Sequence, residues 1–320
     1  MFAAVDPLGF ILFARNCVDP AQVRALVADL RETAGRDDAP VLIDQEGGRV
    51  ARLQPPHWRK APAAARFAAL ARIDEAQATK AAWLNARMLA ADLAELGITV
   101  DCAPVLDVPQ PGAHEVIGDR AVGDTAERSA LLGGAWCAGL LAGGILPVIK
   151  HIPGHGRALV DSHMSLPVVI TPRAELEQVD FAPFHALRAM PWAMTAHVVF
   201  TALDPSFPAT TSPTVIGSVI RGMIGFQGVL VSDDICMAAL GGPVAARAAA
   251  ALRAGCDIVL HCNGKLAEME AVAAACPPVS SEVHDRLLRA ESMRQQPGSF
   301  DRPAAAARLT ELLDGATGAA

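Results

Sequence analysis

The chain has 320 residues, of which 52% are apolar, and its mean hydropathy is +0.30. This size and composition allow a large buried core, in one large α/β domain or in two smaller ones. The formal net charge is -7 and no segment is strongly basic, which argues against nucleic acid or an anionic membrane surface as a partner. No apolar run reaches the length of a membrane span, and the first residues lack the features of a secretory signal, so we expect a cytoplasmic protein.

The seven cysteines contain no Cys-x-x-Cys pair, and Cys256 and Cys262 are the closest two. We therefore expect neither a disulfide framework nor a zinc cage, and we interpret the cysteines as small buried hydrophobic residues. No resident metal and no cofactor are predicted.

Short apolar runs alternate with amphipathic segments from one end of the chain to the other. The predicted strands cover residues 9–14, 41–44, 98–102, 144–149, 192–199, 228–232 and 257–260. The predicted helices begin near Asp19, Asp74, Asp124, Thr171, Ser212 and Ile235, with further helices after Lys265. Fully apolar strands separated by helices indicate a parallel sheet that is covered on both faces.

Polar residues follow the carboxyl ends of several of these strands. They are Asp44, Lys150, His151, His197, Asp233, Asp234 and His261. An open doubly wound sheet accommodates seven strands, but no Gly-x-Gly-x-x-Gly follows any of them, and convergence of polar groups at strand ends is typical of a barrel. We predict a single-domain (β/α)8 TIM-like barrel over residues 1–300, with its first βα unit missing or abbreviated at the amino terminus, and a helical tail over 301–320.

The segment 150–167, KHIPGHGRALVDSHMSLP, follows the apolar run 144–149 and gathers lysine, histidine and aspartate in a Gly- and Pro-rich stretch. Its lack of helical or alternating periodicity predicts a long loop at the exit of a buried strand. Long loops inside compact domains are usually functional. A solvated loop that holds three histidines by chance is the alternative.

Several motifs in this order resemble those of glycoside hydrolase family 3. They are IDQEGGRVARL (43–53), VIGDRAVG (116–123), KHIPGHG with DSHMSLP (150–167) and VSDDICM (231–237). The similarity runs from about residue 9 to 263 and points to the branch of bacterial β-N-acetylglucosaminidases that trim peptidoglycan fragments. The resemblance implies a (β/α)8 barrel that needs no cofactor and that begins with a further strand and helix ahead of the segment resembling residues 9–15.

The resemblance also implies the catalytic residues. Asp233 matches the family's nucleophile, and Asp161 and His163 match an acid/base dyad in which the aspartate holds the imidazole and the imidazole moves the proton. This pairing is chemically sensible, because a free imidazole titrates near pKa ~6.5 and can both give and take a proton at neutral pH. The alternative for Asp233 or Asp234 is that it only caps a helix beginning near Ile235. Because the dyad lies on a Gly-containing loop, we also expect this loop to close after sugar binds.

The residues implied to bind the hydroxyl groups of a non-reducing GlcNAc are Asp44, Arg52, Arg120, Lys150 and His151. Charged donors and acceptors in a sheltered pocket discriminate strongly between hydroxyls that are present and absent. His155 is open between loop packing and substrate contact. Cys236 stands where the family's motif commonly has Ser, so the shape of the pocket is expected to differ slightly.

The expected activity is a retaining exo-β-N-acetylglucosaminidase acting on small saccharides such as GlcNAc-1,6-anhydro-MurNAc, with or without peptide, as a monomer. Three alternatives stay open. The same residues could transfer the glycosyl group to phosphate, and His151, His155, Asp161 and His163 could instead be ligands of a metal-dependent hydrolase. The third alternative is a catalytically silent sensor that binds muropeptides.

Overall fold

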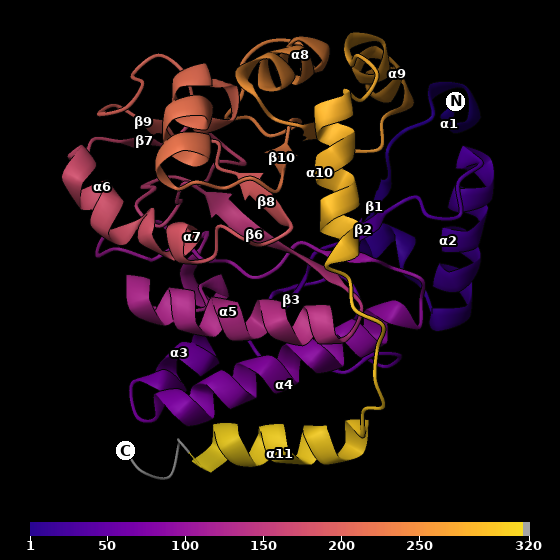
Figure 1. The fold of residues 1–320 in the computed structure, drawn as a ribbon, viewed down its shortest axis with the longest axis vertical. Coiled ribbons are helices and arrows are strands. Elements are labelled where there is room, and N and C mark those ends of the chain that lie inside the picture. Colours follow the sequence, from indigo (N-terminus) through magenta and orange to yellow (C-terminus); the bar gives the residue numbers. More distant parts are fainter. Residues whose placement is uncertain (316–320) are drawn as a thin grey trace.

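A parallel β-sheet forms the centre of the protein, in a computed structural model that describes residues 1–315 (Figure 1). Its strands, in sheet order, are β1 (Phe10–Leu12), β2 (Val41–Ile43), β5 (Val100–Asp101), β6 (Leu146–Ile152), β8 (Trp192–Thr195), β10 (Val229–Asp234) and β11 (Ile258–Leu260). Two short pairs lie outside this sheet: β3 (Gln45–Gly47) with β4 (Val50–Ala51), and β7 (Val168–Val169) with β9 (Val199–Phe200). Neighbouring strands of the central sheet are parallel, so their carboxyl ends meet at one edge.

The helices lie between the strands along the chain. They are α1 (Phe2–Val5), α2 (Pro20–Ala34), α3 (Ala65–Ala71), α4 (Glu75–Ala94), α5 (Ala126–Ala142), α6 (Arg173–Val179), α7 (Ala182–Ala186), α8 (Val244–Ala254), α9 (Leu266–Ala275), α10 (Ser281–Ser292) and α11 (Arg302–Gly315). The 3-10 turns are η1 (Ala14–Asn16), η2 (Gly118–Arg120) and η3 (Ala209–Thr211), and η4 (Val215–Met223) is a π-helix.

The sheet is curled around an apolar interior. Ile11 on one edge strand and Leu260 on the other pack into the same cluster as Val148 from the middle of the sheet. Two edges can share a cluster only if the sheet bends round it. The predicted α/β fold with a parallel, barrel-like sheet is therefore confirmed. Among the described residues the central sheet has seven strands, so the eighth strand of a complete barrel is not part of it.

Helix α10 occupies the inside of the curl between the two edges of the sheet (Figure 1). The side chains of Leu287, Ala290 and Met293 on this helix pack into the apolar interior. Arg286 of the same helix donates to Asp257 Oδ1 over 2.6 Å, just before β11. Apolar burial and a buried ion pair thus hold α10 against the concave face, where it covers apolar side chains that the strands leave open.

The outer layer follows the capping signals of the sequence. Asp19 and Asp74 accept backbone N–H bonds from the residues three positions on, and these bonds start α2 and α4. Helices α4 and α5 pack side by side against the convex face (Figure 1). The helix predicted from Ile235 instead begins at Val244, after a turn in which Gly242 has φ 82. Asp234 therefore caps no helix, and the prediction of a helix start there was wrong.

The C-terminal helix α11 packs against α3 and α4, burying Leu309 and Leu312, and Arg302 pairs with Asp92 over 2.9 Å. Residues 316–320 of the predicted tail lie outside the described residues. Within residues 1–315, none of the helices combines the length and the apolar character that crossing a membrane requires.

Candidate active site

A cavity of about 310 Å³ opens at the carboxyl ends of the parallel strands. Every residue that the sequence analysis selected for catalysis or binding lines it: Asp44, Arg52, Arg120, Lys150, His151, Asp161, His163 and Asp233. The strands carry side chains to this edge because they are parallel. The structure thus brings together residues from four separated motifs in one space.

The floor of the cavity is a buried cluster of charges around Lys150. The Lys150 Nζ donates to Asp44 Oδ1 over 2.8 Å and lies 2.7 Å from Glu46 Oε1. Arg120 donates to both oxygens of Glu46, each over 2.9 Å, and Arg52 donates to Asp44 Oδ2 over 2.9 Å. Lys150 is 1% exposed and Glu46 is 3% exposed. Each charge of the floor therefore has an opposite charge in contact, which is the condition for burying ions.

The charges of this floor stabilise one another in the ionised form. Burial by itself raises the pKa of Asp44, but Lys150 and Arg52 outweigh it and hold that pKa well below its usual range. Burial lowers the pKa of Lys150, but Asp44 and Glu46 outweigh it and raise that pKa above its usual value. At neutral pH the floor therefore presents fixed ions rather than groups that exchange protons.

His151 is fixed by Asp107, which lies beyond β5. The Nδ1 of His151 is 2.6 Å from Asp107 Oδ2, and the backbone N–H groups of His151 and His155 donate to Asp107 Oδ1. An ionised carboxylate only accepts, so the hydrogen of His151 is on Nδ1 and Nε2 is left for another partner. Burial and the adjacent His151 lower the pKa of His155 to about 4, so His155 is neutral at neutral pH.

The loop after β6 brings the predicted dyad to the mouth of the cavity. His163 Nδ1 lies 2.7 Å from Asp161 Oδ1, and the backbone N–H of His163 donates to the same oxygen over 2.9 Å. Burial raises the pKa of Asp161, but these hydrogen bonds outweigh it and lower the pKa overall. Asp161 thus fixes the hydrogen of His163 on Nδ1 and leaves Nε2 free to exchange a proton. The His163 side chain is 62% exposed.

Ser162 fixes this loop between His155 and the turn that follows β10. Its Oγ lies 3.2 Å from His155 Nε2, and its carbonyl oxygen accepts from the Ala239 N–H over 3.2 Å. Ser162 is buried although His163 beside it is exposed. The loop is therefore held at Ser162, whereas the imidazole of the neighbouring His163 is exposed.

Asp233 is the next-to-last residue of β10 and lies on the cavity wall. Its Oδ1 accepts the Asp234 N–H over 2.8 Å. Burial raises the pKa of Asp233, but the imidazoles of His151 and His197 outweigh it, so this pKa is lowered and the carboxylate is ionised at neutral pH. His197 lies behind the wall, where its Nε2 donates to the Asp234 carbonyl over 3.0 Å. Asp233 thus presents a carboxylate to the cavity on a firmly held strand.

The ligand set of the metal-dependent alternative does not converge. Among the described residues, His151, His155, Asp161 and His163 do not bring three ligand atoms within 4.8 Å of one another. His151 is engaged with Asp107, His155 with Ser162, and His163 with Asp161. Their arrangement suits positioning and proton transfer better than coordination.

Two charged residues of the site, Glu46 and Asp107, were not predicted from the sequence. Glu46 stands two residues after Asp44 in the same motif. Because the two carboxylates face the same side, a contact between Glu46 and Lys150 could also have been predicted. Asp107 lies at the end of the segment that leaves β5, and the rule that selected Asp44 and Asp233 would have found it. Gly47, with φ 93, has no room for a Cβ, which would lie 2.5 Å from the Pro62 carbonyl oxygen, so the hairpin carrying Glu46 requires glycine.

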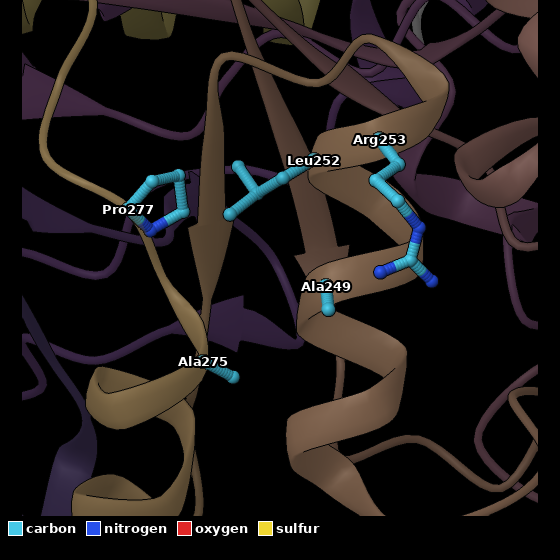
Figure 2. A pocket seen from close by; sticks show the side chains of 5 residues that line it. All are labelled: Ala249, Leu252, Arg253, Ala275 and Pro277. Atoms are coloured by element: carbon cyan, nitrogen blue, oxygen red, sulfur yellow. The ribbon is translucent and has the colours of Figure 1, made fainter.

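A second, smaller hollow lies between α8 and the end of α9 and is a poor candidate. Figure 2 shows its lining side chains on α8, at the end of α9 and on the segment that follows α9. Its volume is about 220 Å³, and its lining is Ala249, Leu252, Arg253, Ala275 and Pro277. It contains neither a carboxylate nor an imidazole, so it lacks groups for acid, base or nucleophilic chemistry.

Comparisons with known proteins agree with the motif set. The model of the glycosyl hydrolase family 3 N-terminal domain matches residues 7–290. A β-hexosaminidase of Alkalilimnicola ehrlichii is 42% identical over 80% of this chain and 73% of its own length. The structure of NagZ from Neisseria gonorrhoeae with N-trifluoroacetyl-D-glucosamine is 34% identical, with a TM-score of 0.85 over 96% of this chain and 90% of that one. A family 3 β-N-acetylglucosaminidase of Paenibacillus is 32% identical, with a TM-score of 0.82 over 95% of this chain, which spans 62% of that one. The chain belongs to glycosyl hydrolase family 3.

Proposed function

We propose that the protein is a retaining exo-β-N-acetylglucosaminidase that releases terminal GlcNAc from peptidoglycan fragments in the cytoplasm. The observation that carries the proposal is that Asp233 and the Asp161–His163 pair line one cavity whose floor is an array of fixed ions. A cavity of about 310 Å³ suits one sugar ring, which favours cleavage at a chain end. The relatives named β-hexosaminidase and β-N-acetylglucosaminidase support the same sugar.

In the first step, the ionised Asp233 attacks the anomeric carbon of the bound GlcNAc. The carboxylate oxygen forms an ester bond to that carbon while the glycosidic bond breaks, and His163 Nε2 gives its proton to the departing oxygen. The aglycone leaves with that proton. Asp161 stabilises the imidazolium before the transfer and keeps the ring oriented by its bond to Nδ1.

In the second step, water replaces the aglycone. His163, now neutral, takes one proton from the water through Nε2 while the oxygen attacks the anomeric carbon and the ester to Asp233 breaks. Free GlcNAc leaves with the β configuration retained, and both side chains return to their starting charge. The exposure of His163 allows it to serve both steps, because aglycone and water approach from the open mouth.

The floor supplies recognition. Arg52 lines the cavity, and its guanidinium carries more N–H donors than the one that it gives to Asp44, so a hydroxyl oxygen of the sugar can accept from it. Asp44 and Lys150 lie beside it in the same cavity and offer an acceptor and a donor. A sugar that lacks the matching hydroxyl would leave these groups unpaired, which gives strong discrimination.

The experiment follows product configuration and the intermediate together. Proton NMR of the reaction with a β-N-acetylglucosaminide should show β-GlcNAc as the first product, and mass spectrometry of the acid-quenched enzyme should find a GlcNAc adduct on the peptide that contains Asp233. First appearance of α-GlcNAc, or an adduct on another peptide, contradicts the mechanism.

Two further readouts address the alternatives. In phosphate buffer, formation of GlcNAc 1-phosphate in place of free GlcNAc identifies a phosphorylase. Binding of GlcNAc-1,6-anhydro-MurNAc without turnover identifies a sensor. The proposed hydrolase should convert this disaccharide to free GlcNAc both in phosphate buffer and in a buffer without phosphate. If peptidoglycan fragments are its substrate, it should also cleave this disaccharide faster than an N-acetylglucosamine disaccharide.

A further inference from the structure

Three potential metal ligands meet next to the proposed active site, on elements that are far apart in sequence. They are Cys236 in the turn after β10, His261 just after β11, and Glu268 in α9. One ligand atom from each lies within 4.8 Å of the other two, and all three residues are half-buried. None of them lines the cavity of the proposed active site.

His261 gives a second, independent sign of a ligand. Its Nε2 is buried and has no hydrogen-bond partner among the described residues, although the side chain is only 10% exposed. The nearest carboxylate oxygen, Glu268 Oε2, is 3.7 Å away, which is too far for a hydrogen bond. A cation that lies about 2.0–2.2 Å from each of these atoms spans that gap, and a buried nitrogen without a partner is costly otherwise.

Glu268 is already oriented by neighbours. Its Oε2 accepts from Asn263 Nδ2 over 2.6 Å, and its Oε1 accepts from Lys265 Nζ over 3.0 Å. An ionised carboxylate oxygen has more than one acceptor site, so Oε2 can keep Asn263 and still coordinate a cation. The Lys265 side chain is largely exposed, so water screens its charge. Asn263 thus acts as the outer partner that metal-binding carboxylates usually have.

We propose that Cys236, His261 and Glu268 form a binding site for a zinc-like divalent cation. A thiolate, an imidazole and a carboxylate suit a borderline-soft ion, whereas Mg²⁺ and Ca²⁺ require oxygen ligands. On binding, the Cys236 thiol loses its proton to solvent as the sulfur–metal bond forms, and water completes the tetrahedral coordination. No electron transfer is involved.

The site is connected to the cavity through Asp234. The backbone N–H groups of Cys236 and Cys262 both donate to Asp234 Oδ1, over 2.9 and 3.2 Å. Asp234 in turn donates its own N–H to Asp233. A cation held by Cys236 and His261 therefore ties together the turns that follow β10 and β11, which form one wall of the cavity.

The test is titration of the full-length protein with Co²⁺, an optical substitute for Zn²⁺. Binding at the proposed site should produce the ultraviolet absorption of a thiolate–cobalt bond at one equivalent, and Zn²⁺ should remove it by competition. Cys236→Ser should abolish this absorption, and His261→Gln and Glu268→Gln should each weaken Co²⁺ binding by at least about 10-fold. The matched control is Cys276→Ser, which changes another half-buried cysteine outside the cluster and should leave the titration unchanged.

Three results would overturn the proposal. One is the absence of saturable Co²⁺ binding in the wild type. The second is thiolate–cobalt absorption that persists in Cys236→Ser. The third is binding that is lost in His163→Ala but kept in Cys236→Ser, which would place the ion on the loop dyad. If Cys236→Ser fails to fold, Glu268→Gln, a change at a side chain that is 32% exposed, decides the outcome with the same titration. This readout does not depend on glycosidase activity.

Discussion

The floor of the cavity and the loop that carries His163 differ in how deeply their charged groups are buried and in how many opposite charges each group contacts. On the floor, Lys150 and Glu46 are almost completely buried and each contacts more than one opposite charge. On the loop, His163 is mostly exposed and has a single charged partner, Asp161. The charges of the floor stay constant during a reaction, whereas the charge of an imidazole at the mouth can change with each step.

In the proposed mechanism, this difference separates recognition of the sugar from proton transfer. A buried ion cluster is preorganised, so it can orient hydroxyl groups without moving, but removal of one member leaves an uncompensated charge. An exposed imidazole contributes little to stability, so it can be placed on a loop and respond to solvent and substrate. Substitutions on the two sides should therefore have different consequences, mainly in rate on the loop and in stability on the floor.

The largest effect is expected at Asp233, which lies on the firmly held strand β10 and forms a bond to the sugar in the proposed mechanism. Asp233→Ala should reduce kcat/KM by at least about 10⁵-fold, because no covalent intermediate can form. Hydrolysis of a chromogenic N-acetyl-β-glucosaminide measures this loss. Asp74→Ala, at an exposed helix cap, should keep the wild-type rate, and a comparable rate in Asp233→Ala would falsify the assignment of the nucleophile.

His163→Ala should reduce kcat/KM by about 10³-fold for a substrate with a poor leaving group, because the departing oxygen then leaves without a proton. The loss should shrink for a 2,4-dinitrophenyl glycoside, whose leaving group needs no proton. Stability should be nearly unchanged, since the side chain is exposed. An equal loss with both leaving groups would argue against proton donation, and His284→Ala on α10 is the control.

Glu46→Gln tests the floor through stability. We expect the free energy of unfolding to fall by about 3 kcal/mol, because Lys150 and Arg120 lose a buried counter-charge. The matched control is Glu177→Gln, which removes an exposed pair with Arg173 of similar length, 2.7 Å, and should cost less than about 0.5 kcal/mol. Urea unfolding of both variants measures the difference, and equal losses would mean that burial does not distinguish the two sides.

Asp161→Ala should have a milder effect on rate than His163→Ala, about 10- to 100-fold in kcat/KM, because the imidazole remains but loses its orientation. The reduction should appear mainly in kcat, since Asp161 supports proton transfer rather than recognition. A loss confined to KM would instead assign Asp161 to sugar binding.

His155 lies between the floor of the cavity and the loop that carries His163. We expect it to make the stability of the protein depend on pH. Its pKa falls from 6.5 to about 4 on folding, so the unfolded chain binds its proton more readily than the folded protein does. Stability from this group is present above pH 6.5 and is lost as the pH falls towards 4. Between pH 6.5 and 4.5 the free energy of unfolding should fall by about 2 kcal/mol more in the wild type than in His155→Gln. Parallel pH profiles from urea unfolding would contradict this.

The sequence predicted which side chains meet in the cavity, because these residues stand in local motifs. Asp44, Lys150 and Asp233 each end a short apolar run, and parallel strands must bring such ends to one edge. The helix before β11 was misplaced at its start, because the turn with Gly242 interrupts an Ala-rich pattern that favours helix on both sides.

The sequence by itself determined where most strands and helices lie along the chain, the motif residues and the family resemblance, since apolar runs, caps and motif spacing are properties of neighbouring residues. The tertiary structure decided which charges are partners. Glu46 with Lys150, Asp107 with His151, and the meeting of Cys236, His261 and Glu268 all join distant segments. Such pairings depend on how the sheet curls and where its turns lie, and long-range packing, which no local pattern contains, sets both.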